Sequence, residues 1–234
     1  SMHMIYQDFM IINAEPGLLI GKITKGIAFF LIMLISFHFL KIWKVKQHVI
    51  PRNLFIGFLF YALAPLFSLS DSMFGLKNAI REGSLLGMSL AFLSSAVGNF
   101  FYYWFITAVF SNEGTAMKNR NKILMLIGGI QIGSTLTGLI LRLIGMNAFV
   151  FSIVYMLSAL YIFLSLAINS RILYRKIDEA EYKNKLRKMS DSSIIMIVAL
   201  VLFAIDSFFA DPTWYSLIGW IFTIVSSYLI KQSY

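Results

Sequence analysis

Long apolar stretches alternate with short polar breaks along the whole chain. A bilayer core about 30 Å thick is crossed by about 20 helical residues, and seven stretches reach that length. They cover about 17–40, 53–71, 84–110, 123–143, 147–170, 192–210 and 213–230. The stretches are continuously apolar, without the every-second-residue alternation of barrel strands. We therefore predict an all-α membrane protein, a bundle of seven transmembrane helices that forms a single domain over residues 1–234.

The composition agrees with this pattern. Hydrophobic residues make up 59% of the 234 residues, charged residues make up 13%, and the mean hydropathy is +0.77. These values exclude a soluble globular domain and a disordered chain. The chain contains no cysteine, which excludes disulfides, thiolate metal sites and cysteine nucleophiles.

The positive charges are unevenly distributed between the two sides of the predicted bundle. Of the 20 lysines and arginines, 15 follow the odd-numbered spans: Lys41, Lys44, Lys46, Arg52, Lys118, Arg120, Lys122, Arg171, Arg175, Lys176, Lys183, Lys185, Arg187, Lys188 and Lys231. Basic loops stay in the cytoplasm. We therefore predict an outside N-terminus, a cytoplasmic C-terminus and a multi-pass protein of the cell membrane. The net charge of +9 then indicates attraction to anionic lipids at the cytoplasmic face, and not to nucleic acid.

One basic segment, 171–191, is longer than the other predicted connections. Arg175/Glu179, Glu179/Lys183 and Glu181/Lys185 have the i,i+4 spacing of helical ion pairs, which predicts helix beyond the membrane. The segment is either a solvated extension over lipid headgroups or a docking surface for a cytoplasmic or membrane signalling partner. The docking candidates are Arg175, Lys176, Lys183, Lys185, Arg187 and Lys188.

Two further patterns concern helix arrangement. Residues 66–72 resemble 202–207 with one gap, and Trp104 and Thr107 match Trp220 and Thr223 in position. This similarity indicates two parallel three-helix units joined by the fourth span, a 3+1+3 plan, although apolar helices also match one another by composition alone. Small residues at every fourth position, including Gly129/Gly133 in the fourth span, predict that the third and fourth spans form the tightly packed centre.

Polar and aromatic residues within the spans are the candidates for a ligand site or solute path. We select Asn99, Tyr103, Trp104, Tyr155, Tyr161, Asp206, Trp220 and Thr223. Ligand sites combine apolar walls with a few convergent polar groups, but hydrogen bonds between helices explain the same residues without a ligand.

Asp206 lies about one helical turn below the predicted outer surface, where an acid is costly unless paired, solvated or protonated. Arg142, at the outer end of the fourth span, is its most plausible partner, with Lys22 and Lys25 as rivals. Asp206 either closes the outer rim of the bundle, serves as a proton- or cation-coupling acid, or forms the polar floor of an outward-facing ligand site.

Missing motifs limit the chemistry. The span 213–230 contains no lysine, which argues against a covalent retinal, and we predict no cofactor. The chain has no nucleophile elbow, zinc-binding H-E-x-x-H or phosphate-binding loop, so we predict no catalytic residues, no metal site and no enzyme activity.

Two functions fit these features. The first is a sensor or receptor-like membrane protein that binds a small or lipidic ligand and relays to a cytoplasmic partner through the 171–191 segment. The alternative is a small-solute transporter or channel in which Asp206 is the coupling acid and Pro65 provides a flexing point. A structural subunit of a larger membrane complex is a third interpretation.

Overall fold

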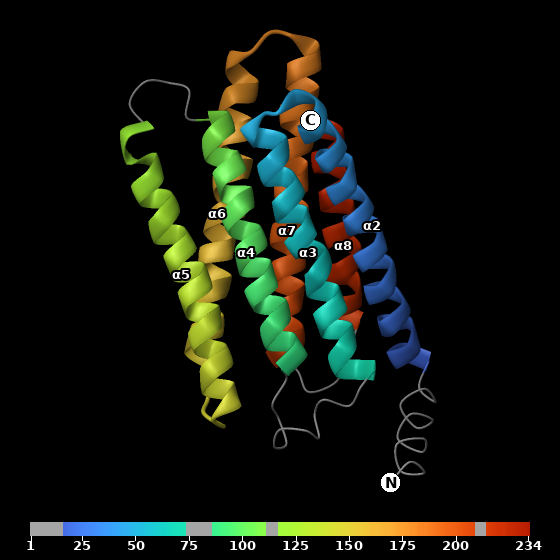
Figure 1. The fold of residues 1–234 in the computed structure, drawn as a ribbon. Helices are drawn as coiled ribbons and strands as arrows, with labels where there is room; N and C mark the ends of the chain where they lie inside the picture. Colours follow the sequence, from blue (N-terminus) through green and yellow to red (C-terminus); the bar gives the residue numbers. More distant parts are fainter. Residues whose placement is uncertain (1–15, 74–85, 111–116, 209–213) are drawn as a thin grey trace.

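The computed structural model describes residues 16–73, 86–110, 117–208 and 214–234, and their secondary structure is α-helical. The helices are α2 (Pro16–Lys46), α3 (Val49–Met73), α4 (Leu86–Phe110), α5 (Met117–Leu143), α6 (Phe149–Lys176), α7 (Ala180–Phe208) and α8 (Trp214–Ser233). Consecutive helices run in opposite directions (Figure 1). We name the end of the bundle where α2 begins the N-terminal end, and the opposite end, where α8 finishes, the C-terminal end.

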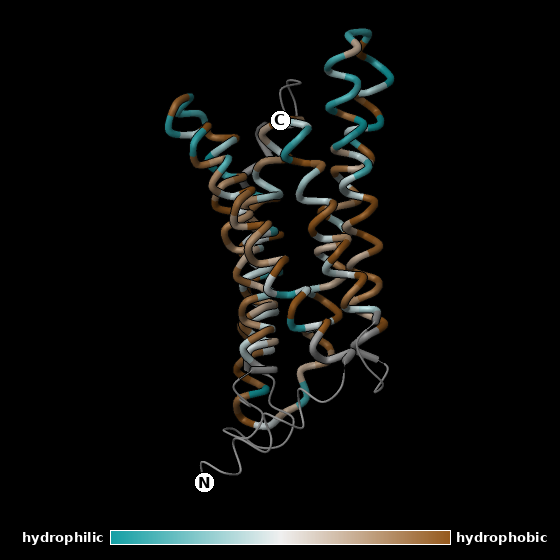
Figure 2. Tube along the Cα trace, turned by 90° about the vertical axis from the view of Figure 1, so that its right-hand side faces the viewer, coloured by the Kyte–Doolittle hydropathy of each residue, from teal (hydrophilic) through white to brown (hydrophobic). Residues whose placement is uncertain are grey.

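Six of the described helices, α2 to α7, are long and apolar enough to cross a membrane. Their outer faces expose large apolar side chains, and Phe30, Leu34, Val150 and Leu157 are each more than 60% exposed. So much apolar surface is unfavourable in water and suits contact with lipid. Figure 2 shows hydrophobic residues along most of the bundle and hydrophilic residues at the tip of the projecting hairpin. These features support the predicted helical, membrane-spanning bundle.

The 20-residue helix α8 is not among the six. Ser216, Thr223, Ser226 and Ser227 interrupt its apolar stretch. The seventh crossing therefore stays a prediction.

Six helices form a closed ring, and α5 lies outside it. Each helix of the ring contacts the next one in the order α2, α3, α4, α6, α7 and α8, and α8 contacts α2. α5 packs mainly against α4 and α6, at one edge of the bundle in Figure 1. The prediction that the fourth span belongs to the packed centre is therefore wrong. A Cβ atom added at Gly129 or Gly133 would meet no atom within 4 Å, because these two glycines face outward.

The backbones of α3 and α4 approach each other closely at Gly98. A Cβ atom added at Gly98 would lie 2.8 Å from the Tyr61 ring and 3.1 Å from the Gly57 carbonyl oxygen. Position 98 therefore requires glycine for steric reasons, in line with the small residues that let helices approach closely in membranes. The contact at Gly98 places Tyr61 of α3 beside Asn99 of α4, the residue that follows Gly98.

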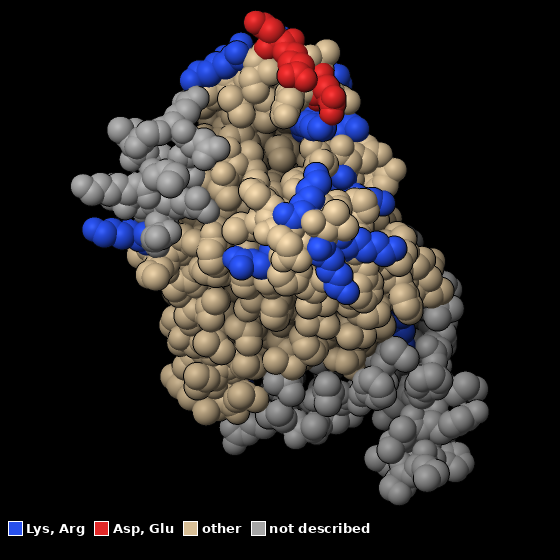
Figure 3. Space-filling model, turned by 45° about the horizontal axis from the view of Figure 1, so that its top comes forward, with Lys and Arg blue, Asp and Glu red and all other residues tan. Residues whose placement is uncertain are grey.

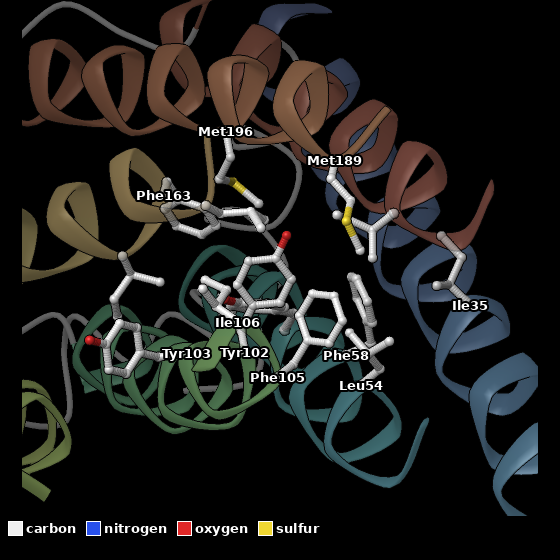
Figure 4. Packing of buried hydrophobic residues seen from close by; sticks show 14 of the residues in the cluster. Ile35, Leu54, Phe58, Tyr102, Tyr103, Phe105, Ile106, Phe163, Met189 and Met196 are labelled. Carbon is white, nitrogen blue, oxygen red and sulfur yellow. The ribbon is translucent and has the colours of Figure 1, made fainter. Parts of the chain in front are cut away.

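Fully buried apolar side chains fill the C-terminal half of the ring. Phe39, Phe58 and Phe105 are each at most 2% exposed, and the rings of Phe39 and Phe58 stack with their centroids 5.7 Å apart. Figure 4 shows Tyr102 directed from α4 towards α7, where Met189 and Met196 lie. Aromatic stacking and dense packing stabilise this half without hydrophobic exclusion from water.

The hairpin of α6 and α7 extends beyond the other helices at the C-terminal end (Figure 1). Its turn, 177–179, is not helical, so the predicted i,i+4 pairs of Glu179 do not form. Lys183 instead lies 3.9 Å from Asp178, and Lys185 makes the predicted pair with Glu181 at 2.7 Å. Helix continues on both sides of the turn as the sequence predicts.

Candidate functional site

A cavity of about 150 Å³ lies inside the ring, and every ring helix contributes to its wall. Its polar lining residues are Lys25, Tyr61, Ser68, Ser95, Asn99, Tyr155, Ser216 and Thr223. Its apolar lining residues are Ala64, Met88, Ala91, Phe92, Met156, Phe163, Met196, Leu200, Phe203 and Trp220. These positions belong to the N-terminal half of the bundle, and the packed aromatic core closes the other half.

The cavity unites four of the eight predicted path residues. Asn99 comes from α4, Tyr155 from α6, and Trp220 and Thr223 from α8. Residues 99, 155 and 223 are nearly fully buried. Three helices thus bring an amide, a phenol, an indole and a hydroxyl to one space inside the ring.

Three predicted path residues lie elsewhere because of helical geometry. Trp104 is five residues after Asn99, which turns it by about 140° at 100° per residue; it stacks on Phe101, and Arg52 lies over its ring. Tyr161 is 48% exposed on the outside of α6. Tyr103 is one turn beyond Asn99 and packs near Tyr161, with ring centroids 6.2 Å apart.

The side chain of Asp206, the eighth path residue, lies outside the described residues, and so does its predicted pairing with Arg142. Arg142 donates hydrogen bonds to Ser89 Oγ at 2.9 Å and to Ser152 Oγ at 3.0 Å. Its guanidinium also lies 5.7 Å from the centre of the Phe92 ring. Arg142 therefore connects α4, α5 and α6 near the N-terminal end of the bundle, beside the cavity wall.

A chain of hydrogen bonds crosses four helices behind the cavity. Tyr61 Oη donates to Asn99 Oδ1 at 2.5 Å, and Asn99 Nδ2 donates to Gln131 Oε1 at 3.1 Å. Gln131 Nε2 donates to the Tyr155 carbonyl oxygen at 3.2 Å and to Ser158 Oγ. We call Tyr61, Asn99, Gln131 and Ser158 the polar chain. Polar groups buried in a membrane protein are costly unless bonded, so this chain fixes the rotamers at the cavity wall.

The sequence analysis selected Asn99 but none of the other three members of the polar chain, of which Gln131 is the most deeply buried. It is 0% exposed and attaches the outer helix α5 to the ring. A signal was present, because Gln131 is an amide in the middle of the apolar span 123–143. Its importance depends on Asn99 and Ser158 facing it, and those distances are not visible in one sequence.

No family model, curated protein or solved structure matches this chain. The functional interpretation consequently depends on the cavity and on the helices that line it. Among the residues that the structure describes, no group of three or more histidine, aspartate or glutamate side chains could hold a metal ion.

The predicted docking residues lie on the projecting α6–α7 hairpin. Arg175, Lys176 and Arg187 are exposed, and Lys183, Lys185 and Lys188 are partly buried. Figure 3 shows lysines and arginines spread over the C-terminal end of the molecule, with the visible acidic side chains gathered at its far tip. The six residues therefore share one basic projection formed by two helices that also line the cavity.

Proposed function

We propose that this protein is a receptor-like membrane protein with seven transmembrane helices, an outside N-terminus and a cytoplasmic C-terminus. The alternating helix directions support an odd number of crossings, since α2 begins and α8 finishes at opposite ends of the bundle (Figure 1). The basic C-terminal end supports the orientation by the positive-inside rule (Figure 3). The cavity then opens towards the outer half of the membrane.

The proposed ligand is a small, mainly apolar molecule with one hydrogen-bonding group. A cavity near 150 Å³ with apolar walls holds a molecule of about the size of a benzene ring. Methionine, phenylalanine and tryptophan side chains supply polarizable walls. Asn99 lines the cavity with a carboxamide that carries both donors and an acceptor, so it is the group that we expect to hydrogen-bond a ligand.

One observation carries the receptor-like proposal: α6 and α7 both line the cavity and both continue into the basic hairpin. Tyr155, Met156 and Phe163 contact the cavity from α6, and Met196, Leu200 and Phe203 contact it from α7. A ligand that moves these two helices apart would also move the hairpin, because a helix transmits displacement along its length. The packed core of the C-terminal half leaves the cavity closed on that side.

Binding can be tested with 4-bromophenol, a one-ring heavy-atom quencher, and a variant in which Trp43, Trp104 and Trp214 are replaced by phenylalanine. Trp220, a cavity residue, is then the remaining tryptophan. We expect saturable quenching of its fluorescence. Ser95→Leu, which places a larger side chain in the cavity, should raise the apparent Kd at least about tenfold, a loss of about 1.4 kcal/mol.

Gly133→Leu is the matched control, since position 133 opens away from the protein. It should leave the apparent Kd within about twofold, well below the tenfold step of 1.4 kcal/mol. Quenching that rises linearly in all variants would reflect partition of the probe into detergent and would contradict a cavity site.

The order of helices around the ring favours a second candidate, a small-solute transporter on a 3+1+3 plan. The contacts α2–α3 and α3–α4 correspond to α6–α7 and α7–α8, and α4–α6 corresponds to α8–α2. α5 then occupies the place of a linker outside two equivalent units. The fully buried Pro65 beside the cavity residue Ala64 would be the flexing point.

Flux in proteoliposomes separates the two candidates. A transporter should carry 4-bromophenol or another small solute faster than protein-free vesicles, and Asp206→Asn should abolish its response to a proton gradient. A receptor should bind the probe without accelerating its flux.

A further inference from the structure

A second concave surface lies on the outside of the bundle, between α6 and α7. It is a groove of about 270 Å³, lined mainly by Ala167, Ile168, Ile172, Ile194, Arg171 and Arg175, with Ser190 at its polar end. Ile168, Ile172 and Ile194 are 55%, 50% and 44% exposed, so the groove faces away from the ring. It shares no lining residue with the interior cavity.

The polar end of this groove is organised around Arg171. Its Nε donates to Ser190 Oγ at 2.8 Å, which joins α6 to α7, and its Nη2 lies 3.5 Å from Asp191. The Arg171 side chain is still 59% exposed. A guanidinium has five N–H donors in a planar fork, so these two contacts leave donors for an incoming anion.

The charge around this end is strongly positive. Arg171 and Arg175 follow each other by one helical turn, and Lys176, Arg187 and Lys188 are nearby in sequence on the same hairpin. Asp191 interacts with both Arg171 and Arg187 and offsets a single charge. The groove thus has a cationic end, and the rest of its wall is lined mainly by isoleucine side chains.

We propose that this groove binds one anionic phospholipid of the cytoplasmic leaflet. Its phosphate would lie against Arg171 and Arg175, because guanidinium groups bind phosphate through paired hydrogen bonds. Its acyl chain would lie along Ile168, Ile172 and Ile194. The site is positioned where the apolar part of α6 changes to its basic extension, which is the depth of a headgroup. The leaflet assignment depends on the proposed topology, whereas lipid binding does not depend on the cavity ligand.

A bound lipid would contact α6 and α7 together, beside the Arg171–Ser190 bond. It would hold the hairpin in one arrangement at the membrane surface. The inference therefore assigns the groove a structural influence on the same two helices that we propose to relay ligand binding.

The test uses the full chain in dodecyl maltoside, titrated with fluorescently labelled phosphatidylglycerol and, in a parallel arm, with phosphatidylcholine of the same chain length. We expect saturable binding of phosphatidylglycerol with one site per chain, and weaker binding of phosphatidylcholine. Arg171→Gln with Arg175→Gln should weaken phosphatidylglycerol binding about 30-fold, since each basic residue near a lipid surface contributes about fivefold.

Two matched variants decide between a defined site and diffuse attraction. Lys183→Gln with Lys185→Gln removes the same charge at the hairpin tip and should change affinity by less than about fivefold. Ile172→Trp fills the groove without changing any charge and should also weaken binding. Equal losses for the arginine and lysine pairs, or normal binding by Ile172→Trp, would overturn the proposal.

Two additional measurements exclude trivial results. Arg175→Gln alone leaves the Arg171–Ser190 bond in place, so it reports on phosphate binding if the double variant fails to fold. Glycerol 3-phosphate, which lacks acyl chains, should not compete at concentrations where phosphatidylglycerol saturates. Full competition by it would identify a phosphate site without a lipid groove and would overturn the proposal. Binding of 4-bromophenol at Trp220, measured in the variant with this single tryptophan, should be unchanged by Arg175→Gln, which separates this test from that of the proposed function.

Discussion

Gly98→Leu is expected to lower the free energy of unfolding by about 3 kcal/mol or more, at the upper end of overpacking effects. A Cβ atom at this position would already lie 2.8 Å from the Tyr61 ring, and 3.1 Å from the backbone oxygen of Gly57. The backbone of α3 cannot turn aside as a flexible side chain would, so α3 and α4 must separate. The measurement is unfolding of the purified protein in mixed detergent micelles, followed by circular dichroism.

Gly129→Leu is the control for this substitution. Position 129 is also a helical glycine, but it has nothing within 4 Å and faces outward. We expect its stability to change by less than about 1 kcal/mol, in the direction of higher stability, because leucine favours helix over glycine. Equal destabilisation by both substitutions would show that glycine matters through the helix backbone and not through the α3–α4 contact.

Asn99→Leu is expected to lower the free energy of unfolding by about 2–3 kcal/mol, somewhat less than Gly98→Leu. It removes the bonds to Tyr61 and Gln131 and leaves two polar partners in an apolar interior. An unpaired buried polar group costs about 1–3 kcal/mol, whereas single interhelical bonds in membranes average about 0.6 kcal/mol. The Tyr61 hydroxyl can regain a partner from water in the cavity, but Gln131 is 0% exposed.

Gln131→Leu should cost less, about 1–2 kcal/mol, because the Asn99 amide that it leaves unpaired lines the cavity. The variant that carries both Asn99→Leu and Gln131→Leu should lose less stability than the sum of the two single losses, with a coupling energy of about 1 kcal/mol in a double-mutant cycle. Asn169→Leu is the control, since the Asn169 amide is exposed and bonds to the Ser165 carbonyl of its own helix. Strictly additive losses for residues 99 and 131 would contradict a continuous polar chain.

The sequence alone predicted the elements of this fold well. Each predicted span overlaps one described helix, because a bilayer requires about 20 apolar residues in a row and polar breaks mark where each run ends. The charge pattern also predicted the helix after 177–179 through the pair of Glu181 and Lys185, whereas the two predicted pairs of Glu179 do not form because the turn interrupts the helix there. Local composition is sufficient for such features, since they depend on residues close together in the chain.

The candidate site was predictable in part. Asn99, Tyr155, Trp220 and Thr223 line the cavity because their helices turn those faces inward. Tyr161 is also a tyrosine of α6, but it points one third of a turn away from Tyr155, on the exposed side of the helix. Helical periodicity groups residues by face, but it does not say which face meets the interior.

The sequence by itself determined the apolar spans, their lengths and the basic end of the bundle, because the solvent preferences of single side chains act locally. The tertiary structure decided that α5 lies outside the ring, that Gly98 and not Gly129 sits at a helix contact, and that Gln131 joins Asn99 to Ser158. Those features depend on which helices become neighbours. In a membrane that choice comes from close packing and paired polar groups across helices, so it depends on residues that lie 27 to 38 positions apart in the chain.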